Sequence, residues 1–424
     1  MIGTVALLVR PAIAGLTLLT CVNAATSQEP FTPKPYDWPQ WQGPDRSAVS
    51  KETGLLKSWP KGGPKQLWHI DTLGIGYATP AIAAGRILTM GNRSESEWVI
   101  ALSEKDGEEL WAYKIGPKRG NEGGYPGPRC TPTVDGPVLY ALGLDGDLVC
   151  LKVDTGKLVW RKHLQADFEG KPGNWGYAES PLIDGDRLLV APGGDKATLV
   201  CLNKTTGKLI WASPIASGDD AAYASIAIAD VDGFKQYIRF LSGGVVGVSA
   251  EDGKFLWRYS KPSAGINCST AIYANSLVYA AAAYGKGGGA AKLTRNGTSV
   301  EATEVYFNNR NENHHGGLVL IDGYLYGEGS STLSCLNFES GKENWRERKV
   351  GKGSVTAADG MLYYRNENGP IYLVEVNSSK FVGKGQFEPK IKTGLPSWPH
   401  PVIANGKLYI RDQQHLFCYD VKAK

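Results

Sequence analysis

The chain has 424 residues, of which 53 are glycine, 42% are apolar and 21% are charged. Apolar and charged fractions of this size are ordinary for a globular protein and exclude a disordered or collagen-like chain. The formal net charge is +4, from 46 Lys and Arg against 42 Asp and Glu, and the basic residues form no runs. We therefore expect no nucleic-acid partner.

The N-terminal 24 residues have the pattern of a signal peptide. The apolar stretch from Ile2 to Ala25 is interrupted by Arg10-Pro11, so neither part reaches the about 20 residues that span a bilayer, and we expect no transmembrane segment. An apolar run follows Arg10 and ends at Val22-Asn23-Ala24, which offers small residues for cleavage. These features predict an exported protein, periplasmic or extracellular. Leu18 to Cys21 only loosely resembles a lipoprotein box, so we expect no lipid anchor.

Residues 25–64 are expected to form a linker and a Trp- and Pro-rich N-terminal segment ahead of one folded domain, residues 65–424. That domain is built from a repeat. Its unit has Ser/Thr-Pro, apolar strands of period two separated by Asp-Gly turns, and a closing Thr-Gly-Lys or similar turn followed by an aromatic residue. The fifth copy is degenerate and has no Trp, and the seventh has also lost its Trp. The closing aromatic residues are Trp111, Trp160, Trp211, Trp257, Tyr306 and Trp345. Their spacing of about 40 to 50 residues is the period of four-stranded propeller blades.

The two ends of this domain complete one blade between them. The last copy begins at Pro401 and stops after three strands, whereas Lys65 to Trp68 is a fourth strand with no three before it. Joining them closes the ring and leaves only short edges exposed. The sequence therefore predicts an all-β, eight-bladed β-propeller of four-stranded antiparallel blades, closed by N- and C-terminal strands that share one blade. We expect a monomer.

Six cysteines follow the expected signal peptide, which in an exported protein suggests disulfides. Four of them occupy the same strand position in different repeats, at Cys150, Cys201, Cys335 and Cys418. Equivalent positions in different blades lie farther apart than the Cα separation of about 7 Å that a disulfide allows. We therefore expect unpaired cysteines that are buried as small apolar residues.

The unit that ends in Asp/Thr-Gly-Lys-x-x-Trp resembles the pyrroloquinoline quinone (PQQ) repeat over about residues 65–421. Quinoprotein alcohol dehydrogenases share this repeat with the propeller lipoprotein of the outer-membrane β-barrel assembly machinery. The leader from Trp38 to Arg46 is similar to the opening of exported PQQ-like propellers of planctomycete-type bacteria, some of them polyvinyl-alcohol dehydrogenase-like. The resemblance implies a quinoprotein alcohol dehydrogenase-like propeller.

In quinoprotein dehydrogenases of this family, PQQ lies over the propeller axis beneath adjacent cysteines, with a calcium ion held by Glu, Asn and Asp. This sequence has no Cys-Cys pair, and its blades lack long insertions. We therefore assign no cofactor and keep PQQ with Ca²⁺ as the alternative.

The residues just before each Ser/Thr-Pro are expected to crowd one mouth of the central channel, because the innermost strand begins each blade. The candidate ligand-binding residues are Tyr77, Arg129, Glu179, Asn267, His314, His315, Lys352 and His400. Cationic and hydrogen-bonding groups with aromatic neighbours suit an anionic, planar ligand. Alternatively, these groups satisfy one another around a polar channel. No residue is assigned a catalytic role.

Two of the six histidines lie in the segment from Asn313 to Gly317. Adjacent strand residues point to opposite faces, so His314 and His315 are not expected to share a metal ion unless the strand is bulged. Glu179 could serve as a ligand or base, or could pair with Arg129. The glycine-rich run from Gly285 to Ala290 lies in no βαβ unit and is expected to be a flexible loop.

Two functions follow from these observations. The first is a binding or scaffold module that holds a protein or saccharide partner at the rim or channel mouth, because the catalytic features of the dehydrogenases are missing. The alternative is a PQQ-dependent dehydrogenase of an alcohol or sugar. In that case Arg129, Lys352 and the histidines would grip the quinone carboxylates, and Glu179 or Asn267 would serve the calcium ion.

Overall fold

A computed structural model describes residues 1–4, 31–120, 125–315, 317–329 and 331–424. By its contacts the chain divides into two units, Met1–Pro30 and Phe31–Lys424. Apart from its first four residues, the expected signal peptide lies outside the described residues, so it stays a prediction. In the parts of the chain that the structure covers, no helix has the length and apolarity needed to cross a membrane.

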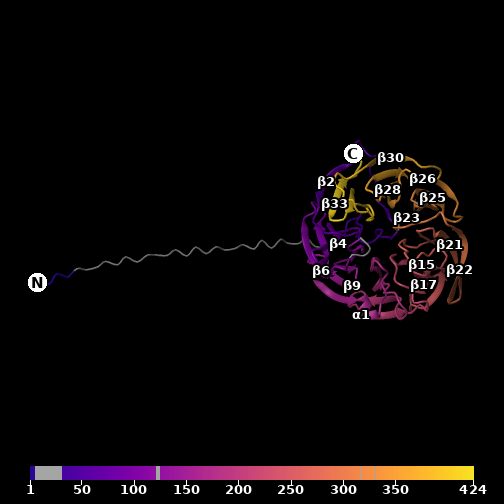
Figure 1. Cartoon of the computed structure of the whole chain (residues 1–424), viewed down its shortest axis with the longest axis horizontal. Helices are drawn as coiled ribbons and strands as arrows, with labels where there is room; N and C mark the ends of the chain where they lie inside the picture. The colour runs from indigo at the N-terminus through magenta and orange to yellow at the C-terminus, as the bar shows by residue number, and fades with distance from the viewer. Residues whose placement is uncertain (5–30, 121–124, 316, 330) are drawn as a thin grey trace. The chain divides into compact units, whose positions relative to one another are not determined.

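The second unit is an eight-bladed propeller of four-stranded antiparallel sheets, which confirms the predicted fold. Figure 1 shows the blades following one another in chain order around one axis. The strands of each blade are given innermost first. Blade 1 has β3 (Ala81–Ala83), β4 (Arg86–Arg93), β5 (Ser96–Ser103) and β6 (Glu109–Pro117), and blade 2 has β7 (Thr133–Asp135), β8 (Val138–Leu142), β9 (Asp147–Lys152) and β10 (Leu158–His163). Blade 3 has β11 (Leu182–Asp184), β12 (Arg187–Val190), β13 (Leu199–Asn203) and β14 (Leu209–Ser213), and blade 4 has β15 (Ala227–Val231), β16 (Phe234–Leu241), β17 (Gly244–Ser249) and β18 (Phe255–Tyr259). A short helix, α1 (Leu164–Phe168), follows β10.

Blades 5 to 8 continue in the same way. Blade 5 has β19 (Ile272–Ala274), β20 (Leu277–Ala282), β21 (Gly287–Asn296) and β22 (Ser299–Asn308), and blade 6 has β23 (Leu318–Ile321), β24 (Tyr324–Glu328), β25 (Leu333–Asn337) and β26 (Glu343–Glu347). Blade 7 has β27 (Gly353–Ala358), β28 (Met361–Asn366), β29 (Ile371–Glu375) and β30 (Gly383–Phe387). Blade 8 has β31 (Val402–Ala404), β32 (Lys407–Asp412), β33 (His415–Asp420) and the N-terminal β2 (Lys65–Ile70). The pairing of β2 with β33 confirms that the two ends share one blade.

In most repeats the closing aromatic residue forms a joint between neighbouring blades; Trp257 is an exception, because its indole Nε1 donates to Gln236 of its own blade at 2.7 Å. The indole Nε1 of Trp111 donates to the carbonyl of Val153 in the next blade at 2.9 Å. The ring also lies against Gly156, whose φ is +67° and whose added Cβ would come within 2.6 Å of it. In blade 5, Tyr306 replaces the Trp, and its hydroxyl donates to the carbonyl of Phe338 at 2.6 Å. The Trp at the end of one repeat therefore packs against the Thr-Gly-Lys turn of the next repeat, and the glycine of that turn leaves room for the ring.

This joint predicts an unequal response to two glycine substitutions. Gly156→Ala should cost about 1 kcal/mol for the left-handed backbone and about 1–3 kcal/mol more for the clash with Trp111. Gly136→Ala is the matched control, because Gly136 also has positive φ (+57°) but nothing lies within 4 Å of its added Cβ. Urea denaturation of both variants measures the difference, and equal losses of stability would contradict the joint.

In the glycine-rich run from Gly285 to Ala290, residues 287–290 are strand and only Gly285 and Lys286 lie in a turn, so the prediction of a flexible loop was wrong for most of the run. Gly287, Gly288 and Gly289 begin β21 and pair with Ala282, Ala281 and Ala280 of β20. A Cβ at Gly289 would come within 2.5 Å of the carbonyl oxygen of Tyr306 and 2.6 Å of the hydroxyl of Tyr259. The glycines therefore serve close packing within the sheet.

Residues 31–64 pack against the propeller. Trp38 forms an antiparallel bridge with Ile82 of blade 1, and the short strand β1 (Val49–Ser50) pairs in parallel with β27 of blade 7. Leu55 bridges to Lys422 near the C-terminus. The boundaries at residues 24 and 64 stay predictions.

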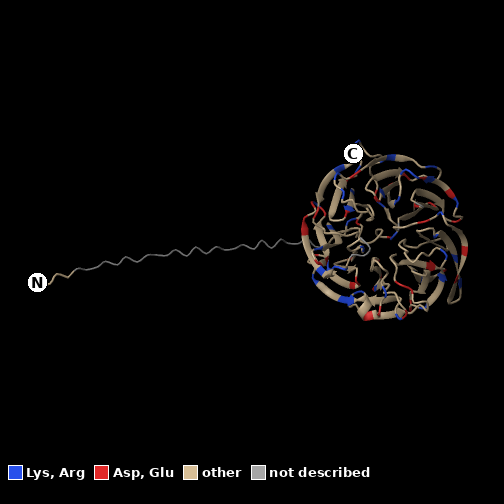
Figure 2. Cartoon of the chain, viewed as in Figure 1, with Lys and Arg blue, Asp and Glu red and all other residues tan. Residues whose placement is uncertain are grey.

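The six cysteines of the described region are unpaired, as expected, and all except Cys268 are buried. Figure 2 shows Lys and Arg interspersed with Asp and Glu around the blades, so in this view neither charge gathers on one side of the ring.

Candidate functional site

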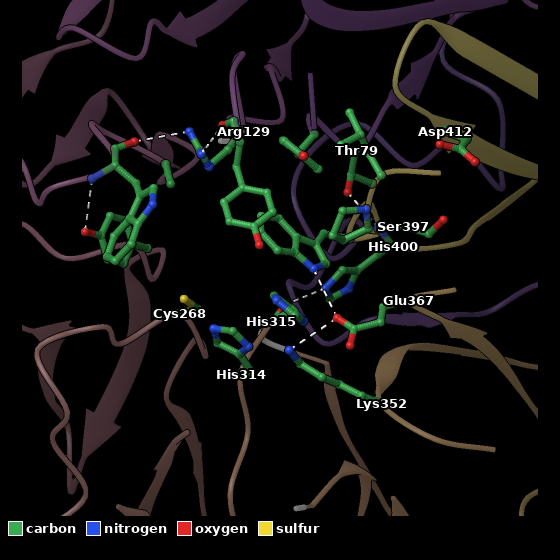
Figure 3. A pocket seen from close by; sticks show the side chains of 18 of the residues that line it. Thr79, Arg129, Cys268, His314, His315, Lys352, Glu367, Ser397, His400 and Asp412 are labelled. Atoms are coloured by element: carbon green, nitrogen blue, oxygen red, sulfur yellow. Dashed lines mark hydrogen bonds and ion pairs between the residues drawn. The ribbon is translucent and has the colours of Figure 1, made fainter. Parts of the chain in front are cut away.

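A cavity of about 720 Å³ lies at one mouth of the channel. It is lined by the segments that precede the innermost strands of all eight blades. Those lining residues, from blade 1 to blade 8, include Tyr77, Arg129, Ala178, Tyr223, Cys268, His314, Lys352 and His400. Figure 3 shows labelled side chains from several of these blades turned toward one space.

Ser and Thr hydroxyls at equivalent positions of the repeats hold these segments together, in Ser/Thr-Pro pairs at Thr79 and Ser180 and at Ser225 without the Pro. The Ser180 hydroxyl accepts from the backbone N–H of Thr131 at 2.9 Å, and that of Ser225 accepts from Ser180 at 3.0 Å. Between blades 8 and 1, the Thr79 hydroxyl accepts from the backbone N–H of His400 at 3.0 Å. Each hydroxyl thereby satisfies a buried backbone donor of a neighbouring blade, and these hydrogen bonds hold in place the segments that line the cavity.

Aromatic rings form much of the cavity wall, with Trp398 at their centre. Its ring centroid lies 4.7 Å from that of Tyr77, 4.8 Å from that of Tyr125 and 4.7 Å from that of His315. Trp41, from the N-terminal segment, lies 4.6 Å from the ring of His400. Flat rings in close contact give a rigid apolar surface with polar edges.

The charged groups of the cavity are engaged with protein partners. Lys352 Nζ lies 3.2 Å from Glu367 Oε2, which also accepts from the indole Nε1 of Trp398 at 3.3 Å (Figure 3). The Arg129 guanidinium donates to the carbonyl oxygens of Tyr125, Gly127 and Trp175 at 2.7, 3.2 and 3.1 Å. These contacts fix the positions of both cations.

The three histidines of the cavity are neutral at ordinary pH. Burial, with a smaller contribution from Lys352, lowers the pKa of His314 to about 4, and burial lowers that of His400 to about 4. Burial, with smaller contributions from His314, Lys352 and His400, also holds the pKa of His315 well below its usual value. His400 Nε2 lies 3.0 Å from the backbone carbonyl of His315 and donates to it, and His314 Nε2 lies 2.9 Å from the Tyr284 hydroxyl.

His315 is a cavity residue whose hydrogen bonding is incomplete, as is Tyr77 at its hydroxyl. Both ring nitrogens of His315 are buried and have no hydrogen-bond partner among the residues that the structure describes. Its ring lines the cavity and stacks on Trp398. A buried imidazole without partners costs free energy, which a hydrogen-bonding ligand would recover.

Two of the eight residues predicted from the sequence do not line the cavity. Glu179 is 1% exposed, pairs with Arg239 at 3.3 Å rather than serving the channel mouth, and accepts from the backbone N–H of Ala191 at 2.6 Å. Asn267 is buried and donates from Nδ2 to the carbonyl of Leu241 at 2.7 Å. Alternation along an extended segment turns these side chains into the blade interfaces. The remaining six lie together at the mouth: Tyr77, Arg129, His314, His315, Lys352 and His400.

Other cavity residues were not assigned to the site from the sequence. They are Trp41, Tyr125, Tyr284 and Glu367. Trp41 belongs to the Trp38 to Arg46 leader, and this motif was the one available signal for its role.

The donors of the cavity do not fit a calcium-linked quinone. In the described ranges, no group of three or more His, Cys, Asp or Glu side chains is arranged to hold a metal ion. The two carboxylates of the cavity are already engaged, Glu367 by Lys352 and Asp412 by the Thr393 hydroxyl at 2.6 Å. Ca²⁺ takes six to eight oxygen ligands, more than these groups offer.

The sequence is similar to one protein family and to several known proteins. The family model described as outer membrane protein assembly factor BamB matches residues 95–347, more than half of the chain. The chain is 22% identical to outer membrane protein assembly factor BamB of Salmonella typhimurium over 202 residues, which are 45% of this chain and 44% of that protein. It is 26% identical to quinoprotein alcohol dehydrogenase PedH of Pseudomonas putida over 222 residues, 51% of this chain and 33% of PedH. The chain spans less than half the length of these two relatives.

Solved structures share the architecture. Quinohemoprotein alcohol dehydrogenase from Comamonas testosteroni superposes with a TM-score of 0.53 at 12% identity, covering 92% of this chain and 81% of that chain. The computationally designed Ika8 protein gives a TM-score of 0.59 at 9% identity, covering 84% of this chain and all of that chain. At such identities the likeness establishes the fold alone.

Proposed function

The chain belongs to the family described as outer membrane protein assembly factor BamB, and on that premise we propose that it is a binding propeller whose axial cavity holds a saccharide. The cavity is the site of recognition, and Tyr77, Arg129, His314, His315, Lys352 and His400 are its polar contributors. We also propose that the protein acts outside the cytoplasm, as its signal-like N-terminus and its relatives' names suggest.

One observation carries this proposal: an aromatic cavity whose cations are already engaged, Lys352 and Lys392 by carboxylates and Arg129 by backbone carbonyl oxygens. Lys352 is paired with Glu367 at 3.2 Å, and Lys392 is paired with Glu388 at 2.8 Å. A tricarboxylate ligand would have to compete with these carboxylates for its cations. A neutral ring with many hydroxyls needs no counter-charge, and it meets both flat faces and hydrogen-bonding groups here.

The neutral imidazole of His315 supports the same ligand. It can accept a hydrogen bond from a sugar hydroxyl through one ring nitrogen and donate through the other. Its stacking on Trp398 fixes the plane of its ring, so the direction of these bonds is set before the ligand arrives.

A PQQ-dependent dehydrogenase is the second candidate, favoured by the similarity to PedH. Its cofactor would have to be held by Arg129, Lys352 and the aromatic rings, without the metal ligands that Glu179 and Asn267 were expected to supply. A protein partner at the rim is the third outcome of a binding test, and it predicts no saccharide or PQQ binding at the cavity.

The proposal predicts a specific effect of Trp398→Ala. Removing the central ring of the aromatic wall should weaken saccharide binding about tenfold or more. Calorimetric titration of the full chain with a panel of neutral oligosaccharides measures the change. Tyr36→Ala is the control, because Tyr36 is 38% exposed and lies outside the cavity. Equal affinity of the Trp398→Ala variant and the unsubstituted protein would contradict the proposed site.

A further inference from the structure

Residues 38–50, here called the stopper, run into the channel and touch the inner parts of six blades. Their backbone bonds to Ile82 of blade 1, Val134 of blade 2 and Ala357 of blade 7, each at 2.8 Å. Side chains of the stopper reach Ser180 of blade 3, Thr270 of blade 5 and His400 of blade 8. A surface linker would not meet so many inner strands, so the stopper occupies the channel itself.

Trp41 is the stopper residue that lines the cavity. Its indole Nε1 donates to the Thr270 hydroxyl at 3.1 Å, and its ring lies 4.6 Å from that of His400. Thr270 lies two residues before Ile272, the first residue of β19, which is the innermost strand of blade 5. Because the innermost strands lead away from the mouth, a ring held at their start lies at the inner end of the cavity.

Arg46 anchors the other side of the stopper. Its guanidinium Nη2 donates to the carbonyl of Ser180 at 2.8 Å, beside the buried pair of Glu179 and Arg239. Burial lowers the pKa of Arg46 to about 10, while the Glu179 carboxylate acts in the opposite direction, so the guanidinium stays charged at neutral pH. A charge held in a buried position resists displacement, because withdrawing it would leave Glu179 less compensated.

We propose that the stopper seals the channel beneath the ligand, that Trp41 is the specificity-determining floor of the cavity, and that Arg46 is its positioning residue. The part of this inference that concerns the ligand rests on the proposed saccharide site, whereas the seal of the channel does not depend on it. A cavity with one entrance takes the end of a saccharide chain rather than a chain threaded through the propeller. Sugar units beyond those that fit above Trp41 should therefore add no binding affinity.

Binding of a length series of neutral oligosaccharides tests the ligand part. In the unsubstituted protein, affinity should rise with length and then stay constant. Trp41→Ala should weaken binding of the shortest ligands about tenfold, and, because it deepens the cavity, it should shift the length at which affinity becomes constant to longer ligands. Unchanged affinities in this variant would overturn the role of Trp41. No binding of any oligosaccharide by the unsubstituted protein would overturn the proposed function instead.

Solvent exchange of the Trp41 indole proton tests the seal without any ligand. NMR on the full chain identifies this resonance by its loss in Trp41→Phe. Thr270→Val, which removes the acceptor hydroxyl at constant shape, and Arg46→Gln should each speed its exchange at least tenfold, and Arg46→Lys should restore part of the protection. The Trp345 indole, bonded to the carbonyl of Asn377 at 2.7 Å, is the internal control and should not change. Rapid exchange in the unsubstituted protein, or no response to either variant, would overturn the seal.

Discussion

Glu179→Gln is expected to lower the free energy of unfolding by about 3–5 kcal/mol, because it leaves a buried guanidinium without its carboxylate. Arg239 is 0% exposed and lies 3.3 Å from Glu179, and the charge of Arg46 acts on the same carboxylate. The amide oxygen of Gln can still accept from the backbone N–H of Ala191, so the variant isolates the lost charge. Urea denaturation followed by circular dichroism measures the change.

Glu388→Gln provides the comparison for this prediction. Glu388 pairs with Lys392 at 2.8 Å, but both side chains are more than 40% exposed. Exposed ion pairs contribute only about 0–1 kcal/mol, so this variant should be nearly as stable as the unsubstituted protein. Similar losses in both variants would contradict the prediction that the buried guanidinium of Arg239 depends on the Glu179 carboxylate.

Acid should destabilise the protein through its buried histidines, and His400→Gln should remove about 3 kcal/mol of this dependence. The unfolded chain binds a proton at His400 near pH 6.5, whereas the folded chain binds it only near pH 4. The unfolded state therefore holds more protons between these values, and stability falls as pH drops from about 7 to 4.

The measurement is the free energy of unfolding as a function of pH for both proteins. Burial raises the pKa of Glu328 to about 7, and this carboxyl titrates in the opposite sense, but it is present in both proteins and cancels in their difference. Curves that stay parallel from pH 7 to 4 would show that His400 is not held neutral by burial.

The repeat made much of the fold predictable. The closing Trp residues, the Thr-Gly-Lys turns and the incomplete last copy are local signals, and together they gave the blade number and the pairing of β2 with β33. The crowding of Tyr77, Arg129, His314 and Lys352 at one mouth followed from the same geometry, because equivalent positions of a propeller converge on its axis.

Other features depend on contacts that no local pattern reveals. The leader around Trp41 and Arg46 has no strand periodicity, and its path is set by partners on six separate blades. Glu179 lies one residue before Ser180-Pro181, whereas Tyr77 and Arg129 lie two residues before Thr-Pro, and its side chain turns toward Arg239 instead of the cavity. The glycines of β21 looked like a loop because the large residues that require them, Tyr259 and Tyr306, are distant in sequence.

The central claim is that the axial cavity binds a neutral saccharide rather than a metal-linked quinone. Parallel calorimetric titrations of the full chain test it most directly, one with neutral oligosaccharides and one with PQQ in the presence and absence of Ca²⁺. The account predicts saccharide binding that is independent of Ca²⁺ and no calcium-dependent binding of PQQ. Micromolar, calcium-dependent PQQ binding together with no response to any saccharide would contradict it.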